Sequence, residues 1–67
     1  MTKAIMLWTR AIVEATTSDE REAIEKDFAE QAAERDDWIY CVEVKGKKYF
    51  VADNGKVGYT AMLTRDY

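Results

Sequence analysis

Hydrophobic and polar positions alternate through the last third of the chain, where two glycine-containing dipeptides separate three short runs. Residues 38–64 read WIYCVEVKGKKYFVADNGKVGYTAMLT. Alternation with a period of two is typical of β-strands, and Lys45-Gly46 and Asn54-Gly55 are typical of two-residue hairpin turns. We therefore predict three antiparallel strands joined by two tight turns. A bulge at Gly46 would shift the first pairing by one residue.

The two turns fix the register of the predicted sheet and so divide its side chains between two faces. The first turn places Cys41 opposite Phe50 and Glu43 opposite Lys48, and the second places Phe50 opposite Tyr59. One face then collects Ile39, Cys41, Phe50, Ala52, Val57, Tyr59, Ala61 and Leu63. The other face collects Trp38, Tyr40, Val42, Val44, Tyr49, Val51, Thr60 and Met62. We expect the first face, with its compact aliphatic residues, to form the core.

Residues 17–36 carry the pattern of an amphipathic helix that begins at a capping box. Thr17 and Glu20 stand three residues apart, the spacing at which each side chain accepts a hydrogen bond from the other's backbone N–H. A narrow apolar stripe follows, made of Ile24, Phe28 and Ala32 with Ala29 and Ala33 alongside. We expect this stripe to cover the core face and the opposite side of the helix to face solvent.

The run KAIMLWTRAIVE at residues 3–14 fits a strand that adds a fourth member to the sheet. Such a strand would place Ile5 and Leu7 on the core face and Met6 and Trp8 on the second face. A helix is the alternative, because short apolar runs are ambiguous and Ala, Met and Leu favour helices.

Together these elements predict an α+β fold of order β-α-β-β-β, in which one helix packs on an antiparallel sheet of three or four strands. We expect residues 1–67 to form a single domain. A chain of this length buries only about 60% of the surface that its unfolded form exposes, so its core is small. With one cysteine and no histidine, a disulfide or a zinc site of the usual kind is excluded. Small domains without such staples commonly rely on a partner.

Charge is unevenly distributed along the chain, which carries a net charge of −3. Residues 19–37 hold nine acidic and three basic residues, whereas residues 38–67 hold five basic and three acidic residues. Carboxylates along an exposed helix can imitate a row of phosphates and attract a protein with a basic surface. The candidate binding residues on this helix are Glu22, Asp27, Glu30 and Glu34. The alternative is that the acidic side serves solubility alone.

The second face of the predicted sheet stays uncovered, because one helix covers one face. Tyrosine, tryptophan and methionine are enriched where proteins meet. The candidate contact residues on this face are Trp8, Trp38, Tyr40, Tyr49 and Met62, for a partner protein or for a homodimer. The alternative is a monomer in which these residues are half-exposed strand formers.

Catalytic chemistry has little support in the sequence. Nucleophilic catalysis needs an activating base, most often histidine, and Cys41 lies in an apolar row, where it reads as a small hydrophobic residue. We expect no enzymatic activity, no metal and no cofactor. The chain has no run near the roughly 18 apolar residues of a membrane span, so we expect a cytoplasmic protein.

Single-stranded nucleic acid is the alternative ligand. Tyr40 and Tyr49 on an open sheet, beside Lys47 and Lys48, would form a stacking platform with cations next to it. A sequence pI near 4.8 and the acidic helix disfavour this alternative, because nucleic-acid-binding domains are usually basic.

The layout of a strand, an acidic helix and the meander WIYCVEV-KG-KKYFVAD-NG-KVGYTAMLT resembles the small single-domain inhibitors that bacteriophages encode to block host machinery, anti-CRISPR proteins among them. The resemblance lies in size, charge and element order over most of the chain, and no motif is shared. It implies stoichiometric inhibition of a host protein by surface binding in the host cytoplasm, without cofactor or turnover.

Overall fold

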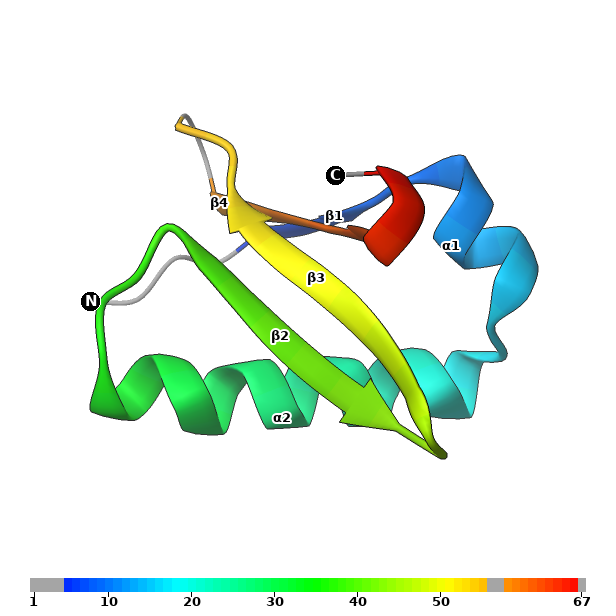
Figure 1. The fold of residues 1–67 in the computed structure, drawn as a ribbon, viewed down its shortest axis with the longest axis horizontal. Helices are drawn as coiled ribbons and strands as arrows, with labels where there is room; N and C mark the ends of the chain where they lie inside the picture. Colours follow the sequence, from blue (N-terminus) through cyan, green and yellow to red (C-terminus); the bar gives the residue numbers. More distant parts are fainter. Residues whose placement is uncertain (1–4, 56–57, 67) are drawn as a thin grey trace.

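The computed structural model describes residues 5–55 and 58–66 of the chain. In order, its elements are β1 (Ile5–Trp8), α1 (Arg10–Ala15), α2 (Ser18–Glu34), β2 (Ile39–Val44), β3 (Lys47–Asp53), β4 (Gly58–Leu63) and the short 3-10 helix η1 (Thr64–Asp66) (Figure 1). The predicted α+β class and the order β-α-β-β-β are confirmed. The short helix α1 is an addition to the predicted elements.

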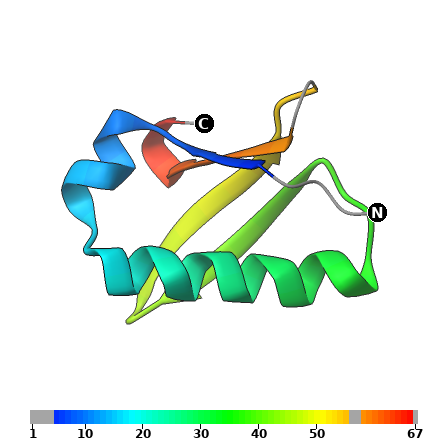
Figure 2. The same cartoon turned by 180° about the vertical axis from the view of Figure 1, so that it is seen from behind.

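The four strands form one mixed sheet in the order β1-β4-β3-β2. β2, β3 and β4 pair in antiparallel fashion, as predicted, but β1 pairs with β4 in parallel. The prediction of a wholly antiparallel sheet is therefore wrong. Helix α2 lies behind β2 and β3 in Figure 1 and in front of them in Figure 2, so it covers one face of the sheet.

The segment predicted as a strand over residues 3–14 divides at Thr9. Its first part is β1, and its second part is α1, whose N-cap is Thr9. The Thr9 hydroxyl accepts a hydrogen bond from the backbone N–H of Ile12 at 3.3 Å. Ile12 is fully buried, because α1 turns this side chain into the core. Each of the two alternatives for this segment thus holds for part of it.

The predicted capping box at the start of α2 is confirmed. The Thr17 hydroxyl accepts from the Glu20 N–H at 3.2 Å, and a Glu20 carboxylate oxygen accepts from the Thr17 N–H at 2.8 Å. The helix ends at Glu34, two residues before the predicted end. Its inward stripe is Ile24, Phe28 and Ala32, as predicted. The half-buried flank is formed by Asp27 and Gln31, whereas Ala29 and Ala33 are exposed.

The first hairpin has the predicted register, with Cys41 opposite Phe50 and Glu43 opposite Lys48. Lys45 and Gly46 both adopt positive φ angles, 54° and 78°, which is the conformation that a two-residue turn of this kind requires. The bulge at Gly46 is therefore not formed.

The second hairpin departs from the prediction, because its loop is longer than two residues. Phe50 lies opposite Met62 instead of Tyr59. The Asp53 carboxylate accepts from the Gly55 N–H at 2.7 Å, and the Asn54 side-chain oxygen accepts from the Gly58 N–H at 3.3 Å. These side-chain bonds hold the wider loop, so the register shifts by three residues. Val57 was predicted to face the core, but this residue is outside the part of the chain that the structure describes.

The helix-covered face is the face that the sequence pattern predicted to be open, so the predicted assignment of the two faces is wrong. The core consists of Ile12, Ile24, Tyr40, Val42, Tyr49, Val51, Tyr59 and Ala61. Met6, Trp8, Phe28, Ala32, Val44 and Leu63 pack against it. Among the predicted contact residues, Tyr40 and Tyr49 are only 1% and 3% exposed, and Trp8 is half-buried against the core. These three side chains do not form a surface.

Candidate functional site

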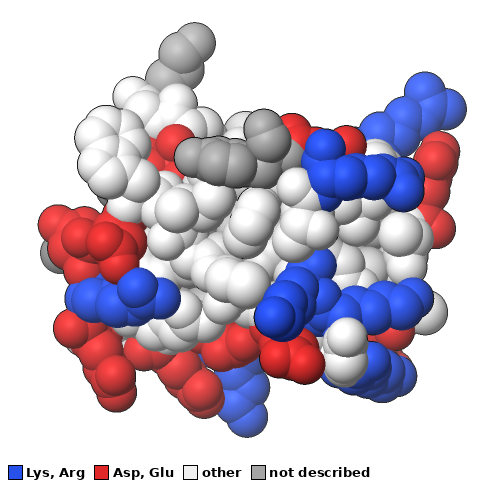
Figure 3. Space-filling model, viewed as in Figure 1, with Lys and Arg blue, Asp and Glu red and all other residues white. Residues whose placement is uncertain are grey.

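The sheet face opposite α2 carries a set of uncharged residues that we call the open face. Its members are Leu7, Ile39, Cys41, Phe50, Ala52, Thr60 and Met62. Register places them in two rows: Leu7, Thr60, Ala52 and Ile39 run across all four strands, and Met62, Phe50 and Cys41 run across three. No described helix or strand covers this face, and Figure 3 shows an uncharged area over β2 and β3.

Exposure on the open face varies from residue to residue. Leu7 is 46% exposed, Cys41 is exposed, and the remaining members are half-buried. Of the predicted contact residues, Met62 alone belongs to the open face. The surface is therefore built from aliphatic side chains with Phe50, Met62 and Cys41, and the predicted belt of tryptophan and tyrosine is absent from it.

Tyr40 can face the core because its hydroxyl group finds hydrogen-bond partners at the margin of the core. The Tyr40 hydroxyl donates to the Arg35 carbonyl at 2.9 Å and accepts from the Asp37 N–H at 2.9 Å. The rings of Phe28, Tyr40 and Tyr59 form a cluster with centroid distances of 4.7 to 6.2 Å. Tyr40 thus closes the C-terminal end of α2, which is a structural role.

The predicted acidic residues of α2 divide into two groups. Glu22, Glu30 and Glu34 are exposed, and the described residues provide no ion pair for any of them. Asp27 is half-buried instead, because its carboxylate accepts from the Glu43 N–H at 3.3 Å. The structure therefore places Glu22, Glu30 and Glu34 on the outward side of α2 and Asp27 against the edge of β2.

The edge of β2 is protected by two side chains of α2. Besides the Asp27 bond, the Gln31 amide donates to the Cys41 carbonyl at 2.9 Å. Both bonds use backbone groups of β2 that point away from β3. An unpaired strand edge invites pairing with another chain, so Asp27 and Gln31 disfavour the addition of a strand at this edge.

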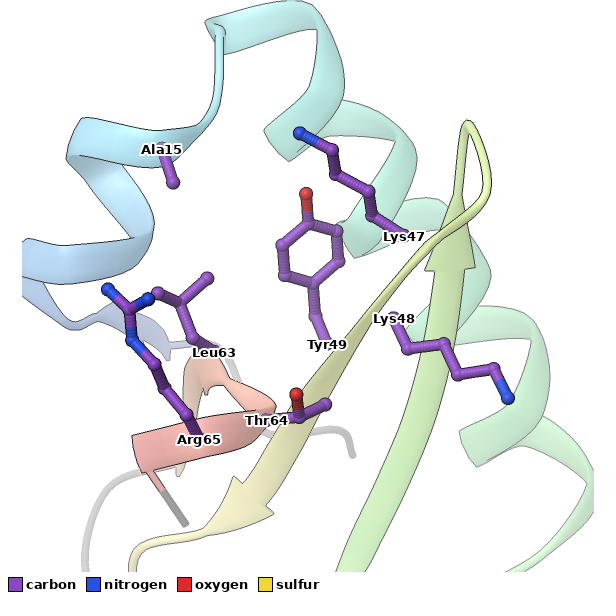
Figure 4. Close-up of a pocket in the computed structure, with 7 residues that line it drawn as sticks. All are labelled: Ala15, Lys47, Lys48, Tyr49, Leu63, Thr64 and Arg65. Carbon is purple, nitrogen blue, oxygen red and sulfur yellow. The ribbon is translucent and has the colours of Figure 1, made fainter.

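A basic hollow of about 260 Å³ lies where α1, β3 and η1 meet (Figure 4). Its lining comprises Ala15, Lys47, Lys48, Tyr49, Leu63, Thr64 and Arg65. Lys47 and Arg65 reach toward the hollow, whereas the ammonium group of Lys48 points away from it.

Burial raises the pKa of Tyr49, and the negative charge of Glu20 adds to this effect. The backbone hydrogen bond from Thr17 lowers the pKa of Glu20, and the nearby lysines lower it further.

An acidic hollow of about 210 Å³ lies at the opposite end of β2 and β3. It is lined by Asp36, Asp37, Trp38 and Asp53. Trp38 is 82% exposed, so this predicted contact residue is accessible although it lies beyond the end of β2. Arg35 pairs with Asp37 at 2.6 Å, which reduces the net negative charge here. Sequence reasoning missed this end-to-end separation of charge, because Asp53 and Asp37 become neighbours only through the strand pairing.

Within the described residues, no group of histidine, cysteine, aspartate or glutamate side chains is arranged to hold a metal ion. None of the described helices is long and apolar enough to cross a membrane. Comparisons with protein families, with curated proteins and with solved structures gave no match. Function must therefore be argued from the surfaces of the molecule.

Proposed function

We propose that this protein is a non-catalytic protein-binding module that occupies a basic surface of its partner with the outward side of α2. The observation that carries the proposal is the charge of this side. Its exposed acidic residues are Asp19, Glu22, Glu25, Glu30 and Glu34, with Lys26 as the exposed base between them. This row has about one carboxylate per 5 Å of helix axis, against about 3.4 Å between phosphates of one duplex strand.

The helix that presents these carboxylates is held at both ends and along its side. The capping box fixes its first turn, the Tyr40 hydroxyl fixes its last turn, and Asp27 and Gln31 bond to β2. A surface that is ordered before binding avoids the entropy cost of ordering it in the complex. Rigid presentation therefore supports a role for these side chains in binding.

The partner class that fits this charge is a host protein that handles nucleic acid in a basic groove. Binding would be stoichiometric and would block the groove, as the resemblance to phage-encoded inhibitors implies. Electrostatic attraction of this kind accelerates association and weakens as ionic strength rises. In this proposal the protein acts in the cytoplasm of the host cell.

We do not advance the alternative of a single-strand binder, because its stacking residues are in the core. Tyr40 and Tyr49 are almost fully buried, so neither ring can stack on a base while the domain is folded. Lys47 and Lys48 remain at the surface, but surface lysines without an aromatic platform do not indicate a single-strand site.

Competition for a basic groove tests the proposal. A labelled duplex of about 20 base pairs, bound to each of a panel of basic DNA-binding proteins that includes CRISPR effectors, is titrated with this protein while polarisation is followed. We expect displacement from at least one member of the panel. The double variant Glu30→Lys/Glu34→Lys should weaken this displacement by about tenfold or more, because it reverses adjacent charges on α2.

The matched control is Glu14→Lys/Asp66→Lys, which changes the net charge equally at exposed positions outside α2. We expect it to alter displacement by less than about threefold, since only distant, screened charges change. Equal displacement by the α2 variant and the unmodified protein contradicts the role of α2. Displacement from no member of the panel contradicts the proposed partner class.

A further inference from the structure

We propose that the open face is a self-association surface, and that its occupant is a second copy of this chain laid face to face in antiparallel orientation. The starting observation is that the open face spans all four strands and bears exposed apolar side chains. Leu7 is 46% exposed and the Cys41 side chain is also exposed. Two such faces would pack about 10 Å apart, as stacked sheets do.

The direction of the second copy follows from the charges at the two ends of the open face. At one end, Lys45 lies in the β2–β3 turn and Lys47 and Lys48 are the first residues of β3, with Arg65 nearby and Glu43 opposite Lys48. At the other end Asp36, Asp37 and Asp53 line the acidic hollow. The ends are about 20 Å apart, since β3 runs from Lys47 to Asp53 at about 3.4 Å per residue. Figure 3 shows most of the basic residues on the side of the turn, with some acidic residues among them, and mainly acidic residues toward the opposite end.

A two-fold axis can relate two stacked faces in two simple ways. An axis that lies between the faces and runs across the strands reverses the second copy, so each basic end meets an acidic end. An axis along the strands instead places basic ends together and acidic ends together. Like charges brought together in an interface are unfavourable, whereas complementary charges fix register. The charge distribution therefore selects the antiparallel arrangement, which is isologous and closes at two copies.

The size of the open face sets the strength of this dimer. Four strands at about 4.8 Å spacing and about 20 Å length give roughly 400 Å² per copy, or roughly 800 Å² in total. Stable interfaces bury about 1,200 to 2,000 Å². This estimate already includes the charged ends of the sheet and falls short of that range, so the dimer should be weaker than a stable complex. We expect a reversible dimer with a dissociation constant in the micromolar range.

Self-association through the open face leaves α2 accessible. Because α2 covers the opposite face of each sheet, the two helices of the dimer lie on its outer sides. The acidic surface of the proposed function would be presented twice, facing away from the dimer axis. The dimer does not depend on that function, because none of its contacts involves the outward side of α2.

Light scattering after size-exclusion chromatography tests the dimer, with the unmodified protein loaded from about 1 µM to about 500 µM. We expect the mass to rise from the 7.7 kDa of one chain to twice that value. The single cysteine reports the surface involved: reaction of Cys41 with a thiol reagent should slow over the same concentration range. A monomeric mass at every concentration overturns the proposal.

Variants separate the open face from other surfaces. Leu7→Lys should raise the dissociation constant by about tenfold or more, because it places a charge in the apolar row. The control is Val13→Lys, since Val13 is 42% exposed on α1 outside the open face, and it should leave the constant unchanged. A dimer that is indifferent to Leu7→Lys and leaves Cys41 reactive overturns the proposal in favour of another interface.

Charge reversal tests the antiparallel orientation. Lys48→Glu and Asp36→Lys should each weaken the dimer, and the double variant should restore it, because basic and acidic ends meet across the interface. Strengthening by Asp36→Lys alone would instead show that acidic ends meet, which overturns the orientation. Protection of Cys41 by a different protein, with this chain monomeric, overturns the choice of occupant. The duplex competition with the Glu30 and Glu34 variant is independent of these results.

Discussion

Replacing Tyr40 with phenylalanine tests which face of the sheet α2 covers. The structure buries this side chain, and its hydroxyl group links the Arg35 carbonyl to the Asp37 N–H with two bonds of 2.9 Å. Phenylalanine keeps the ring next to Phe28 and Tyr59, so the packing of the aromatic cluster is retained. The substitution therefore removes two hydrogen bonds at the C-terminal end of α2 and leaves a minimal gap.

The size of the effect follows from these two bonds. A neutral hydrogen bond contributes about 0.5 to 1.5 kcal/mol net to stability. Arg35 and Asp37 are exposed residues, so water can partly replace the hydroxyl group. We expect a loss of about 1 to 2 kcal/mol in the free energy of unfolding. In a domain of this size that loss lowers Tm by about 4 to 16 °C, which circular dichroism during heating measures directly.

Cys41→Ser is the matched control, because Cys41 is the next residue and lies on the open face. At low micromolar concentration, where the proposed dimer is dissociated, we expect it to change stability by less than about 0.5 kcal/mol. The alternation pattern alone predicted the reverse assignment, with Tyr40 in solvent and Cys41 in the core. An unchanged Tm for Tyr40→Phe, together with a large loss for Cys41→Ser, would refute the packing described here.

Three further predictions concern the capping box and the two groups with shifted pKa values, Glu20 and Tyr49. Thr17→Ala removes the acceptor for the Glu20 N–H and should cost about 1 kcal/mol in urea unfolding, whereas Thr17→Ser should restore most of the loss. The pKa of Glu20 is lower in the folded chain than its ordinary 4.5, so folding is favoured above that pH and stability falls as pH decreases through it. The pKa of Tyr49 is raised above 10.0, so stability also falls as pH rises past 10. In unfolding measured against pH, the acid dependence should become weaker in Glu20→Gln and the alkaline dependence weaker in Tyr49→Phe; unchanged profiles would contradict these causes.

The features that sequence predicted correctly are those that nearby residues determine. Thr17 and Glu20 bond to each other across a single turn, so their spacing is sufficient to locate the start of α2. Lys45 and Gly46 adopt the positive φ angles of a two-residue turn, so the pairing of β2 with β3 follows from the turn alone. Outward positions of Glu22, Glu30 and Glu34 follow from the helical period.

The features that sequence missed depend on contacts between distant segments. The parallel pairing of β1 with β4 joins Ile5 to Gly58, and nothing in residues 3–14 indicates the direction of that pairing. The break at Thr9 had a local signal, because threonine is a favoured N-cap residue. Thr9 is followed three residues later by Ile12 instead of a glutamate or glutamine, so no capping box forms there. The signal at Thr9 was therefore weaker than the capping box of α2.

The inverted faces of the sheet follow from one loop. A two-residue loop at Asn54-Gly55 would put Tyr59, Ala61 and Leu63 on the face of Phe50, and that face then appears to be the richer in apolar residues. The observed loop shifts the register by three residues, and an odd shift turns every side chain of β4 to the other face. With β4 reversed, the apolar majority moves to the face of Tyr40 and Val51. The sequence already contained a sign that the predicted assignment was wrong. That assignment placed Glu43 and Lys48 on the core face, where burying an ion pair is costly.

The same reversal decides which surfaces are available for function. With the tyrosines inside, the aromatic belt is absent, and Trp38 stands apart from the open face at the acidic end. The open face is then a small apolar surface with opposite charge at its two ends, which is self-complementary under a two-fold rotation and poorly suited to a uniformly basic partner. The outward side of α2 has the opposite character, because it is acidic along its length and repels a second copy of itself. The two proposed binding surfaces therefore differ in charge, and the fold keeps them on opposite sides of the sheet.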